Sequence, residues 1–294
     1  MSQDITVPIS SREVVSIFKK YGLRPQKGRG QNFLVDRATA IKIVEAAGVE
    51  PGDRVIEIGP GLGALTLPLA RRGARVLALE IDTGLFNLMQ DLFRPYPLVQ
   101  PLHGDALEVT WADLIQSHFG QKARVKLLSN LPYSISSPLL YRLMEQRFPF
   151  SKAVIMLQAE VARRLVSPPG SKEYGSLSVL SQYYISGTIL FLVPRHLFWP
   201  RPEVESAVVS LKPRSPLLEP SQEPIFWQVV KGVFRFRRKT ILNGLLRTFP
   251  WGKERALKIL QAADIDPRRR PETLSGGEFA NLGRLIYNES SRLF

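Results

Sequence analysis

The sequence predicts an α/β fold: a mostly parallel β-sheet with helices on both faces, followed by a small all-α domain. Between residues 54 and 157, apolar runs of strand length alternate with segments of helix length, which is typical of β–α–β units around a buried parallel sheet. Beyond residue 224 the apolar residues recur at helical spacing, and a segment with four prolines separates the two patterns. We therefore expect two domains, residues 1–212 and residues 213–294.

The expected helices and strands follow one another in a definite order. Residues 12–21 carry apolar side chains on one helical face, and residues 38–47 form a second helix that Gly48 ends. Residues 183–193 and 206–211 are expected to pair as antiparallel strands at a sheet edge, since no obvious long helix separates them. The body is expected to hold strands at residues 54–58, 75–79, 97–102, 125–128 and 153–157, and the tail helices at residues 225–246, 254–263 and 277–287.

Composition excludes several classes of protein. The chain has 294 residues, of which 44% are hydrophobic and 22% charged, so it can bury a sizeable core. The absence of cysteine excludes disulfides, thiolate zinc sites, iron–sulfur clusters and cysteine nucleophiles, and three histidines are too few for a histidine-rich site, so we expect no metal. No apolar run approaches the roughly 18–20 residues that span a bilayer, and the N-terminus does not resemble a signal peptide. We expect a cytoplasmic protein with no membrane partner.

The positive charge is concentrated at the two ends of the chain. The formal net charge is +14, divided into +4 for residues 1–37, +3 for residues 38–212 and +7 for residues 213–294. A nearly balanced body with basic ends is expected when the ends contact phosphates. From charge alone, an anionic membrane surface would also be a suitable partner, and a solvated basic surface without any partner is an equal alternative.

The strongest local motif runs from Val55 to Thr66 and consists of a strand, a glycine-rich turn and the start of a helix. Gly59 and Gly61 allow the backbone to approach a ligand closely. Glu80 ends the next strand, 21 residues after Gly59, where a carboxylate can accept hydrogen bonds from both ribose hydroxyls of a nucleoside cofactor. Taken alone, the loop could equally bind NAD or serve only for packing.

Two further strand ends help to discriminate NAD from another nucleoside cofactor. Asp105 follows the third strand, where its carboxylate can accept a hydrogen bond from an adenine amino group. The fourth strand ends in Asn130, Leu131, Pro132 and Tyr133, at the sheet edge where α/β folds bind their ligands. Nothing in the sequence resembles a site for hydride transfer. Together these features resemble an S-adenosylmethionine-dependent methyltransferase that acts on an amino nitrogen.

The tetrapeptide suits methylation of the adenine N6 atom, whose lone pair is delocalised into the ring. The Asn130 side-chain oxygen and the Leu131 carbonyl can accept both amino hydrogens and draw the nitrogen toward a pyramidal geometry. Pro132 stiffens the turn, and Tyr133 offers a ring for stacking on an unpaired or flipped base. No strong general base is required, because the methylated nitrogen is acidic. The alternative is an ordinary turn at a strand end.

With these residues in view, the sequence resembles the ribosomal RNA adenine N6,N6-dimethyltransferases, most closely the bacterial small-subunit branch of that family. The resemblance runs from Gln31 to Ser206 and implies a Rossmann-like methyltransferase sheet. It rests on motifs that occur in order: Gly30-Gln-Asn-Phe-Leu34, Glu57-Ile-Gly-Pro-Gly61-Leu-Gly63, Leu79-Glu-Ile-Asp82, Gly104-Asp-Ala-Leu107, Asn130-Leu-Pro-Tyr-Ser-Ile135, Met156-Leu-Gln-Ala-Glu-Val161 and Phe198-Trp-Pro-Arg-Pro-Glu-Val-Glu-Ser206.

The resemblance implies roles for individual residues. Asn130 would bridge cofactor and target, and Phe198 would face Tyr133 across the target adenine. The residues that would contact S-adenosyl-L-methionine are Asn32, Leu34, Gly59, Gly61, Glu80, Asp105 and Asn130.

The basic ends would hold the RNA. Aromatic and cationic residues interleave between residues 233 and 243, where Phe234 and Phe236 are expected to serve packing. The expected phosphate contacts are Lys19, Lys20, Lys27, Arg29, Arg235, Arg237, Arg238 and Lys239.

The implied activity is the N6,N6-dimethylation of two adjacent adenosines in a hairpin near the 3′ end of small-subunit 16S rRNA. The substrate would be a small-subunit precursor, and the enzyme a monomer. Two alternatives are an adenine dimethyltransferase of large-subunit 23S rRNA, of the erythromycin-resistance type, and a non-enzymatic RNA-binding factor of ribosome assembly.

Overall fold

The computed structural model describes residues 10–121 and 123–290. The chain divides into two compact units, one formed by residues 1–162 and 187–213, the other by residues 163–186 and 214–294. The predicted domains, residues 1–212 and 213–294, would need a single division of the chain. The structure differs, because residues 163–186 group with the C-terminal helices.

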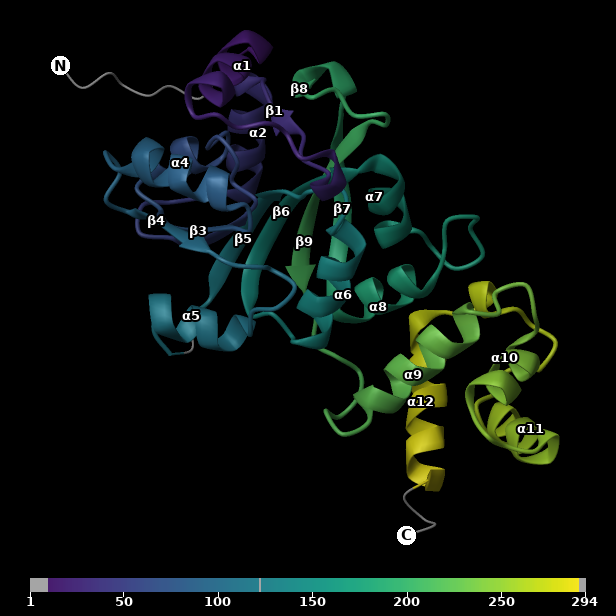
Figure 1. Cartoon of the computed structure of the whole chain (residues 1–294). Coiled ribbons are helices and arrows are strands. Elements are labelled where there is room, and N and C mark those ends of the chain that lie inside the picture. The colour runs from purple at the N-terminus through teal and green to yellow at the C-terminus, as the bar shows by residue number, and fades with distance from the viewer. Residues whose placement is uncertain (1–9, 122, 291–294) are drawn as a thin grey trace. The chain divides into compact units, whose positions relative to one another are not determined.

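A seven-stranded sheet forms the body of the first unit, with the strand order β4-β3-β2-β5-β6-β9-β7 (Figure 1). The first five strands of that order pair in parallel, and β9 is antiparallel to β6. The predicted parallel sheet is therefore confirmed, and the two later strands lie next to each other at its edge. The bounds are β2 (Arg54–Ile58), β3 (Arg75–Glu80), β4 (Val99–His103), β5 (Val125–Asn130), β6 (Phe150–Gln158), β7 (Ile185–Val193) and β9 (Ser206–Pro213).

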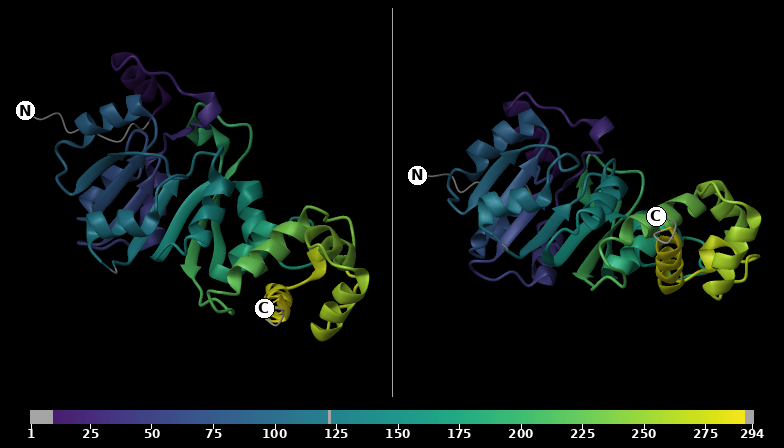
Figure 2. Two further views of the ribbon diagram at one scale, coloured as in Figure 1. Left: turned by 60° about the horizontal axis from the view of Figure 1, so that its bottom comes forward. Right: turned by 90° about the horizontal axis from the view of Figure 1, so that it is seen from below.

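The central strands are apolar on both faces because helices flank the sheet on both sides (Figures 1 and 2). Every residue of β3 after Arg75 is buried, and the same holds for β2 after Arg54. No helix among the described residues is long and apolar enough to cross a membrane. The flanking helices are α2 (Arg37–Ala47), α3 (Thr66–Arg71), α4 (Thr83–Phe93), α5 (Trp111–Phe119) and α6 (Ser136–Glu145).

The N-terminal segment is attached to the sheet unit by a small strand pair that the sequence did not predict. After α1 (Ser11–Lys20) and a short 3₁₀ turn, β1 (Phe33–Leu34) pairs antiparallel with β8 (Phe198–Trp199). The Phe18 ring of α1 makes edge contacts with Phe33 and Trp199, at centroid distances of 5.1 and 5.6 Å. Strands of two residues carry no periodic pattern, which explains why the pairing is invisible in the sequence.

The second unit is helical. Its core contains the fully buried Phe226 and Phe279, and the Tyr174 hydroxyl donates to the Leu274 carbonyl at 2.8 Å. Its helices are α8 (Ser176–Tyr184), α9 (Glu223–Phe234), α10 (Ile241–Thr248), α11 (Lys253–Ala262) and α12 (Gly276–Ser290), and α7 (Ala159–Val166) spans the division between the units.

Two predicted element boundaries in this region are wrong. The single helix expected at residues 225–246 is two helices, because Thr240 acts as an N-cap and accepts a hydrogen bond from the Asn243 N–H at 3.4 Å. The strand expected from Tyr183 begins at Ile185, since Tyr183 still belongs to the last turn of α8. Aromatic residues suit both a strand and a buried helix face, so this boundary carried no clear local signal.

Candidate active site

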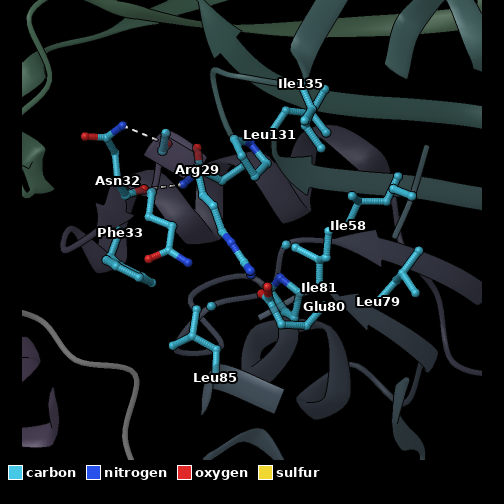
Figure 3. A pocket seen from close by; sticks show the side chains of 18 of the residues that line it. Arg29, Asn32, Phe33, Ile58, Leu79, Glu80, Ile81, Leu85, Leu131 and Ile135 are labelled. Carbon is cyan, nitrogen blue, oxygen red and sulfur yellow. Dashed lines mark hydrogen bonds between the residues drawn. The ribbon is translucent and has the colours of Figure 1, made fainter. Parts of the chain in front are cut away.

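A cavity of about 290 Å³ lies at the carboxyl ends of the central parallel strands in the first unit (Figure 3). Its walls come from the N-terminal arm, defined here as residues 24–34, from the glycine-rich turn after β2, and from the ends of β3, β4 and β5. The structure brings most predicted site residues to these walls, namely Arg29, Asn32, Leu34, Gly59, Gly61, Glu80, Asp105, Asn130, Leu131, Pro132 and Tyr133.

The glycine-rich turn is enclosed on two sides. Gly59 and Gly61 have φ values of +65° and +56°, in the left-handed region that favours glycine. A Cβ atom on Gly61 would lie 3.0 Å from the Phe33 ring of the arm, and one on Gly59 would lie 3.3 Å from Pro132. Both the backbone conformation and the close approach of the neighbours therefore require glycine here.

Glu80 places a buried carboxylate at the end of β3. The residue is 5% exposed, and Oε1 accepts a hydrogen bond from the Asp82 N–H at 2.9 Å. Burial raises the pKa of Glu80 to about 6, against the opposing effect of backbone N–H donors. A carboxylate that is charged at pH 7 but poorly solvated is suited to accept hydrogen bonds from ribose hydroxyls.

Asp105 lies beside Glu80 at the end of the neighbouring strand. The Gly104 N–H donates to the Glu80 carbonyl at 2.9 Å, and the Leu107 N–H donates to Asp105 Oδ1 at 2.8 Å. The half-buried Asp105 carboxylate is thereby fixed at the cavity edge. Two carboxylates on adjacent strand ends fit the ribose and the adenine amino group of one nucleoside.

Glu57 is an acidic residue of the cavity wall that the sequence reasoning missed as a site residue. It lies in β2, is 1% exposed and accepts a hydrogen bond from the Thr66 hydroxyl at 2.7 Å. Burial raises the pKa of Glu57 to about 8, so the side chain is mostly protonated at pH 7. The signal available in the sequence was an acidic residue among the apolar residues Val55, Ile56 and Ile58 of this strand.

Asn130 connects the end of β5 to the N-terminal arm. Its Nδ2 donates to the Asn32 carbonyl at 2.9 Å, which orients the amide and leaves its oxygen able to accept. The turn that follows is held by the Leu131 N–H, which donates to the Met156 carbonyl at 2.9 Å, and by the Ser136 hydroxyl, which donates to the Pro132 carbonyl. The predicted acceptors therefore lie on a restrained turn in the cavity wall.

Tyr133 is positioned by a residue that the sequence reasoning did not single out. Its hydroxyl lies 2.5 Å from the hydroxyl of Ser206, the fully buried first residue of β9. Phe198, by contrast, is 2% exposed, pairs with Leu34 across the β1–β8 ladder and is absent from the described residues that line the cavity. The face-to-face arrangement of Phe198 and Tyr133 around a base stays a prediction.

The predicted phosphate contacts of the first unit differ in their surroundings. Lys19 and Lys20 are exposed on α1. Arg29 lines the cavity instead, and its guanidinium lies 3.5 Å from Asp82 Oδ2. The side chain of Lys27 lies outside the described part of the structure.

The cations of the second unit also divide into two groups. Arg235, Arg238 and Lys239 are exposed. Arg237 donates to the Lys172 carbonyl at 2.7 Å and lies 3.6 Å from Glu272, so part of its hydrogen-bonding capacity is used within the unit. The Phe234 ring packs on Phe279 and Tyr174 at centroid distances of 5.8 and 6.2 Å, in agreement with a packing role.

Comparison with known proteins agrees with this geometry. A model of the ribosomal RNA adenine dimethylase family matches residues 23–281. The ribosomal RNA small subunit methyltransferase A of Geobacillus thermodenitrificans (strain NG80-2) is 42% identical over 290 residues, covering 97% of this chain and 98% of that protein. The protein of the same name from Pelotomaculum thermopropionicum is 45% identical over 284 residues, covering 94% and 96%.

Solved structures agree with the sequence matches. A dimethyladenosine transferase from Plasmodium falciparum has a TM-score of 0.69 at 27% identity, covering 86% of this chain and 96% of that chain. The 23S rRNA methyltransferase ErmE has a TM-score of 0.62 at 27% identity, covering 86% and 99%. With a cavity whose glycine turn and carboxylates fit S-adenosyl-L-methionine as cofactor, this chain belongs to the ribosomal RNA adenine dimethylase family.

Proposed function

We propose that the protein dimethylates N6 of two adjacent adenosines in a hairpin near the 3′ end of 16S rRNA. The substrate is a small-subunit precursor, and the enzyme acts in the cytoplasm as a monomer. Relatives that are 41–45% identical over nearly the whole chain are named ribosomal RNA small subunit methyltransferase A, which supports this choice. The 27% identity to ErmE gives weaker support to a 23S rRNA substrate.

One observation carries the chemical part of the proposal. The Asn130–Tyr133 turn lies in the wall of the same cavity as the two carboxylates, Glu80 and Asp105. The carboxylates suit the ribose and adenine of a cofactor, and the turn offers neutral acceptors and an aromatic ring to a second molecule. Both partners of a methyl transfer can thus be bound side by side.

The residues of the turn prepare the target nitrogen. When bound, S-adenosyl-L-methionine supplies an activated methyl group. The Asn130 oxygen and the Leu131 carbonyl accept the two N6 hydrogens and direct the lone pair toward the cofactor side of the cavity. Tyr133 stacks on the base, and Pro132 keeps the acceptors in place. The proton on the methylated nitrogen then leaves to water, so no residue has to act as a strong base.

The exposed cations of each unit contact the phosphates of the RNA. Lys19 and Lys20 in the first unit, and Arg235, Arg238 and Lys239 in the second, are accessible to phosphates. RNA affinity should therefore fall steeply as salt rises, because each phosphate contact releases counterions. An RNA affinity that does not change with salt concentration would contradict the role of these cations as phosphate contacts.

A methylation assay tests the substrate. The protein is incubated with labelled S-adenosyl-L-methionine and either unmethylated small ribosomal subunits or 23S rRNA, and labelled nucleosides are identified after digestion. We expect N6,N6-dimethyladenosine from the small subunits alone. Small subunits that already carry the modification are the matched control and should accept no label. Label in 23S rRNA alone would contradict the proposed substrate and would indicate that the protein methylates 23S rRNA.

A further inference from the structure

We propose that Asp82 is a positioning residue that holds the N-terminal arm closed over the cofactor site. It lies two residues after Glu80 and directly before α4. Its side chain is buried, with 6% of the residue exposed. The proposal concerns the binding of S-adenosyl-L-methionine, so it is independent of which RNA is methylated.

The two carboxylate oxygens of Asp82 have different partners. Oδ1 accepts a hydrogen bond from the Leu85 N–H at 3.0 Å and caps the N-terminus of α4. Oδ2 accepts from the arm: Gln26 Nε2 lies at 2.7 Å, Gln31 Nε2 at 3.4 Å and Arg29 Nη1 at 3.5 Å. One oxygen therefore stabilises a helix, and the other gathers three side chains of the arm.

Asp82 also connects the arm to the cofactor carboxylate. The Asp82 N–H donates to Glu80 Oε1 at 2.9 Å, so the anchor of the arm and the predicted ribose acceptor share a hydrogen bond. Figure 3 shows the Arg29 side chain extending from the arm toward the strand end that carries Glu80. The negative charge of Asp82 is balanced by Arg29 and by the N–H groups at the start of α4.

The other end of the arm is fixed at the target side of the cavity. The Ser134 hydroxyl donates to the Arg29 carbonyl at 2.8 Å, and Asn130 Nδ2 donates to the Asn32 carbonyl at 2.9 Å. Gly30 has a φ of +64°, and a Cβ there would lie 2.8 Å from the Ser134 nitrogen. The arm is thus attached at both ends of the cavity, and residues 28–34 form one wall of it. Releasing the Asp82 end should open a route by which bound cofactor leaves.

Asp82→Asn separates the two tasks of this residue. Asparagine is as good an N-cap as aspartate, so its oxygen can retain the bond from the Leu85 N–H. Its amide nitrogen would then face the donors of Gln26, Gln31 and Arg29. Arg29 has no acceptor to offer and loses its ion pair, and Gln31 could accept only by giving up the bond that its Oε1 takes from the Gln26 N–H at 2.8 Å. We expect the dissociation constant of S-adenosyl-L-methionine to rise about tenfold, mainly through faster dissociation. Amide hydrogen exchange in residues 24–34 should become faster.

Asp36→Asn is the matched control. Asp36 caps α2 by accepting from the Thr39 N–H at 2.7 Å, and it does not line the cavity. The Asp36→Asn substitution should leave both the cofactor affinity and the amide hydrogen exchange of the arm unchanged. If Asp82→Asn behaves as Asp36→Asn does, Asp82 is merely a helix cap and the proposal is wrong.

Two further variants keep the test decisive if Asp82→Asn lowers stability. Gln26→Ala combined with Gln31→Ala removes two donors of the arm and leaves the cap of α4 intact, and it should weaken cofactor binding in the same way. Adding Gln26→Glu to Asp82→Asn restores a donor–acceptor pair with the roles exchanged, and it should recover part of the affinity. Unchanged affinity in the double alanine variant, or no recovery in the second pair, would overturn the proposal. Calorimetry and hydrogen exchange without RNA give both readouts.

Discussion

The two ends of the cavity offer different chemistry to the two ligands that we propose for them. At the cofactor end, Glu80 and Asp105 place carboxylates at the ends of neighbouring parallel strands, each held by a backbone N–H donor. At the target end, Asn130 and the turn through Tyr133 offer an amide, carbonyls and a ring, without a formal charge. Charge suits the hydroxyl and amino donors of a cofactor that is to be held, whereas neutral acceptors orient a reacting nitrogen.

The two ends also differ in how they are restrained. The Glu80 and Asp105 carboxylates each accept from the N–H group two residues later in the chain, so their positions depend on local backbone. The target end depends on contacts from distant parts of the chain, since Asn130 binds the arm and Tyr133 binds Ser206 of β9. We therefore expect substitutions at the cofactor end to change affinity, and substitutions at the target end to change the rate of transfer.

Asn130→Ala should have the largest effect. It removes an acceptor that acts on the reacting nitrogen, and loss of such an oriented group costs about 100-fold or more in rate. RNA affinity should change little, because the phosphate contacts lie elsewhere. Single-turnover methylation measures the rate, and filter binding measures the RNA. Because Asn130 also holds the Asn32 carbonyl, cofactor affinity must be measured as well. Unchanged turnover would contradict the proposed mechanism.

Glu80→Gln should have the next largest effect, and it should change the affinity for the cofactor. Loss of a charged acceptor for the ribose weakens cofactor binding by about 10- to 100-fold, as expected for a hydrogen bond to a charged group. The cofactor-free protein should become more stable at pH 7.5, by up to about 2 kcal/mol, because the charged Glu80 is poorly solvated. Calorimetric titration and thermal unfolding check the two effects. A variant that loses stability and retains affinity would contradict both.

The pKa of Glu80 also predicts a pH dependence with a definite sign. In the folded protein the pKa is about 6, above the 4.5 of an unperturbed glutamate, so the folded state binds the proton more tightly. This contribution to stability is present below pH 4.5 and is lost as pH rises through 6. Cofactor binding requires the charged form and has the opposite dependence, with affinity about tenfold lower at pH 5 than at pH 7. Glu80→Gln should abolish that change, and its persistence in the variant would assign it to another group.

The comparison of the two ends also explains what the sequence could predict. The acids and glycines of the cofactor end follow apolar strands directly, and parallel strand ends converge on one edge, so Glu80 and Asp105 could be placed together from local pattern alone. The strands of the body were predictable for the same reason, because residues buried on both faces leave an uninterrupted apolar run.

Contacts that join distant segments were not predictable in this way. The Asp82 carboxylate accepts a hydrogen bond from Gln26, which lies 56 residues earlier in the chain. The Tyr133 hydroxyl shares a hydrogen bond with the hydroxyl of Ser206, which lies 73 residues later. Neither pair leaves a periodic signal in the sequence. The same holds for the two-residue pairing of β1 with β8, in which Phe198 is buried.

Ser206→Ala should give the smallest of these effects, and it tests whether the target end depends on distant support. Without the Ser206 hydroxyl, the Tyr133 ring loses the contact that fixes its orientation but keeps its own face for stacking. A neutral hydrogen bond contributes about 1 kcal/mol, so we expect a roughly fivefold rise in KM for the RNA with a smaller change in kcat. Tyr133→Phe should produce the same change, and combining the two substitutions should add nothing further, because both remove one interaction. Additive losses would mean that Ser206 acts on the fold of β9 rather than on the ring that meets the target base.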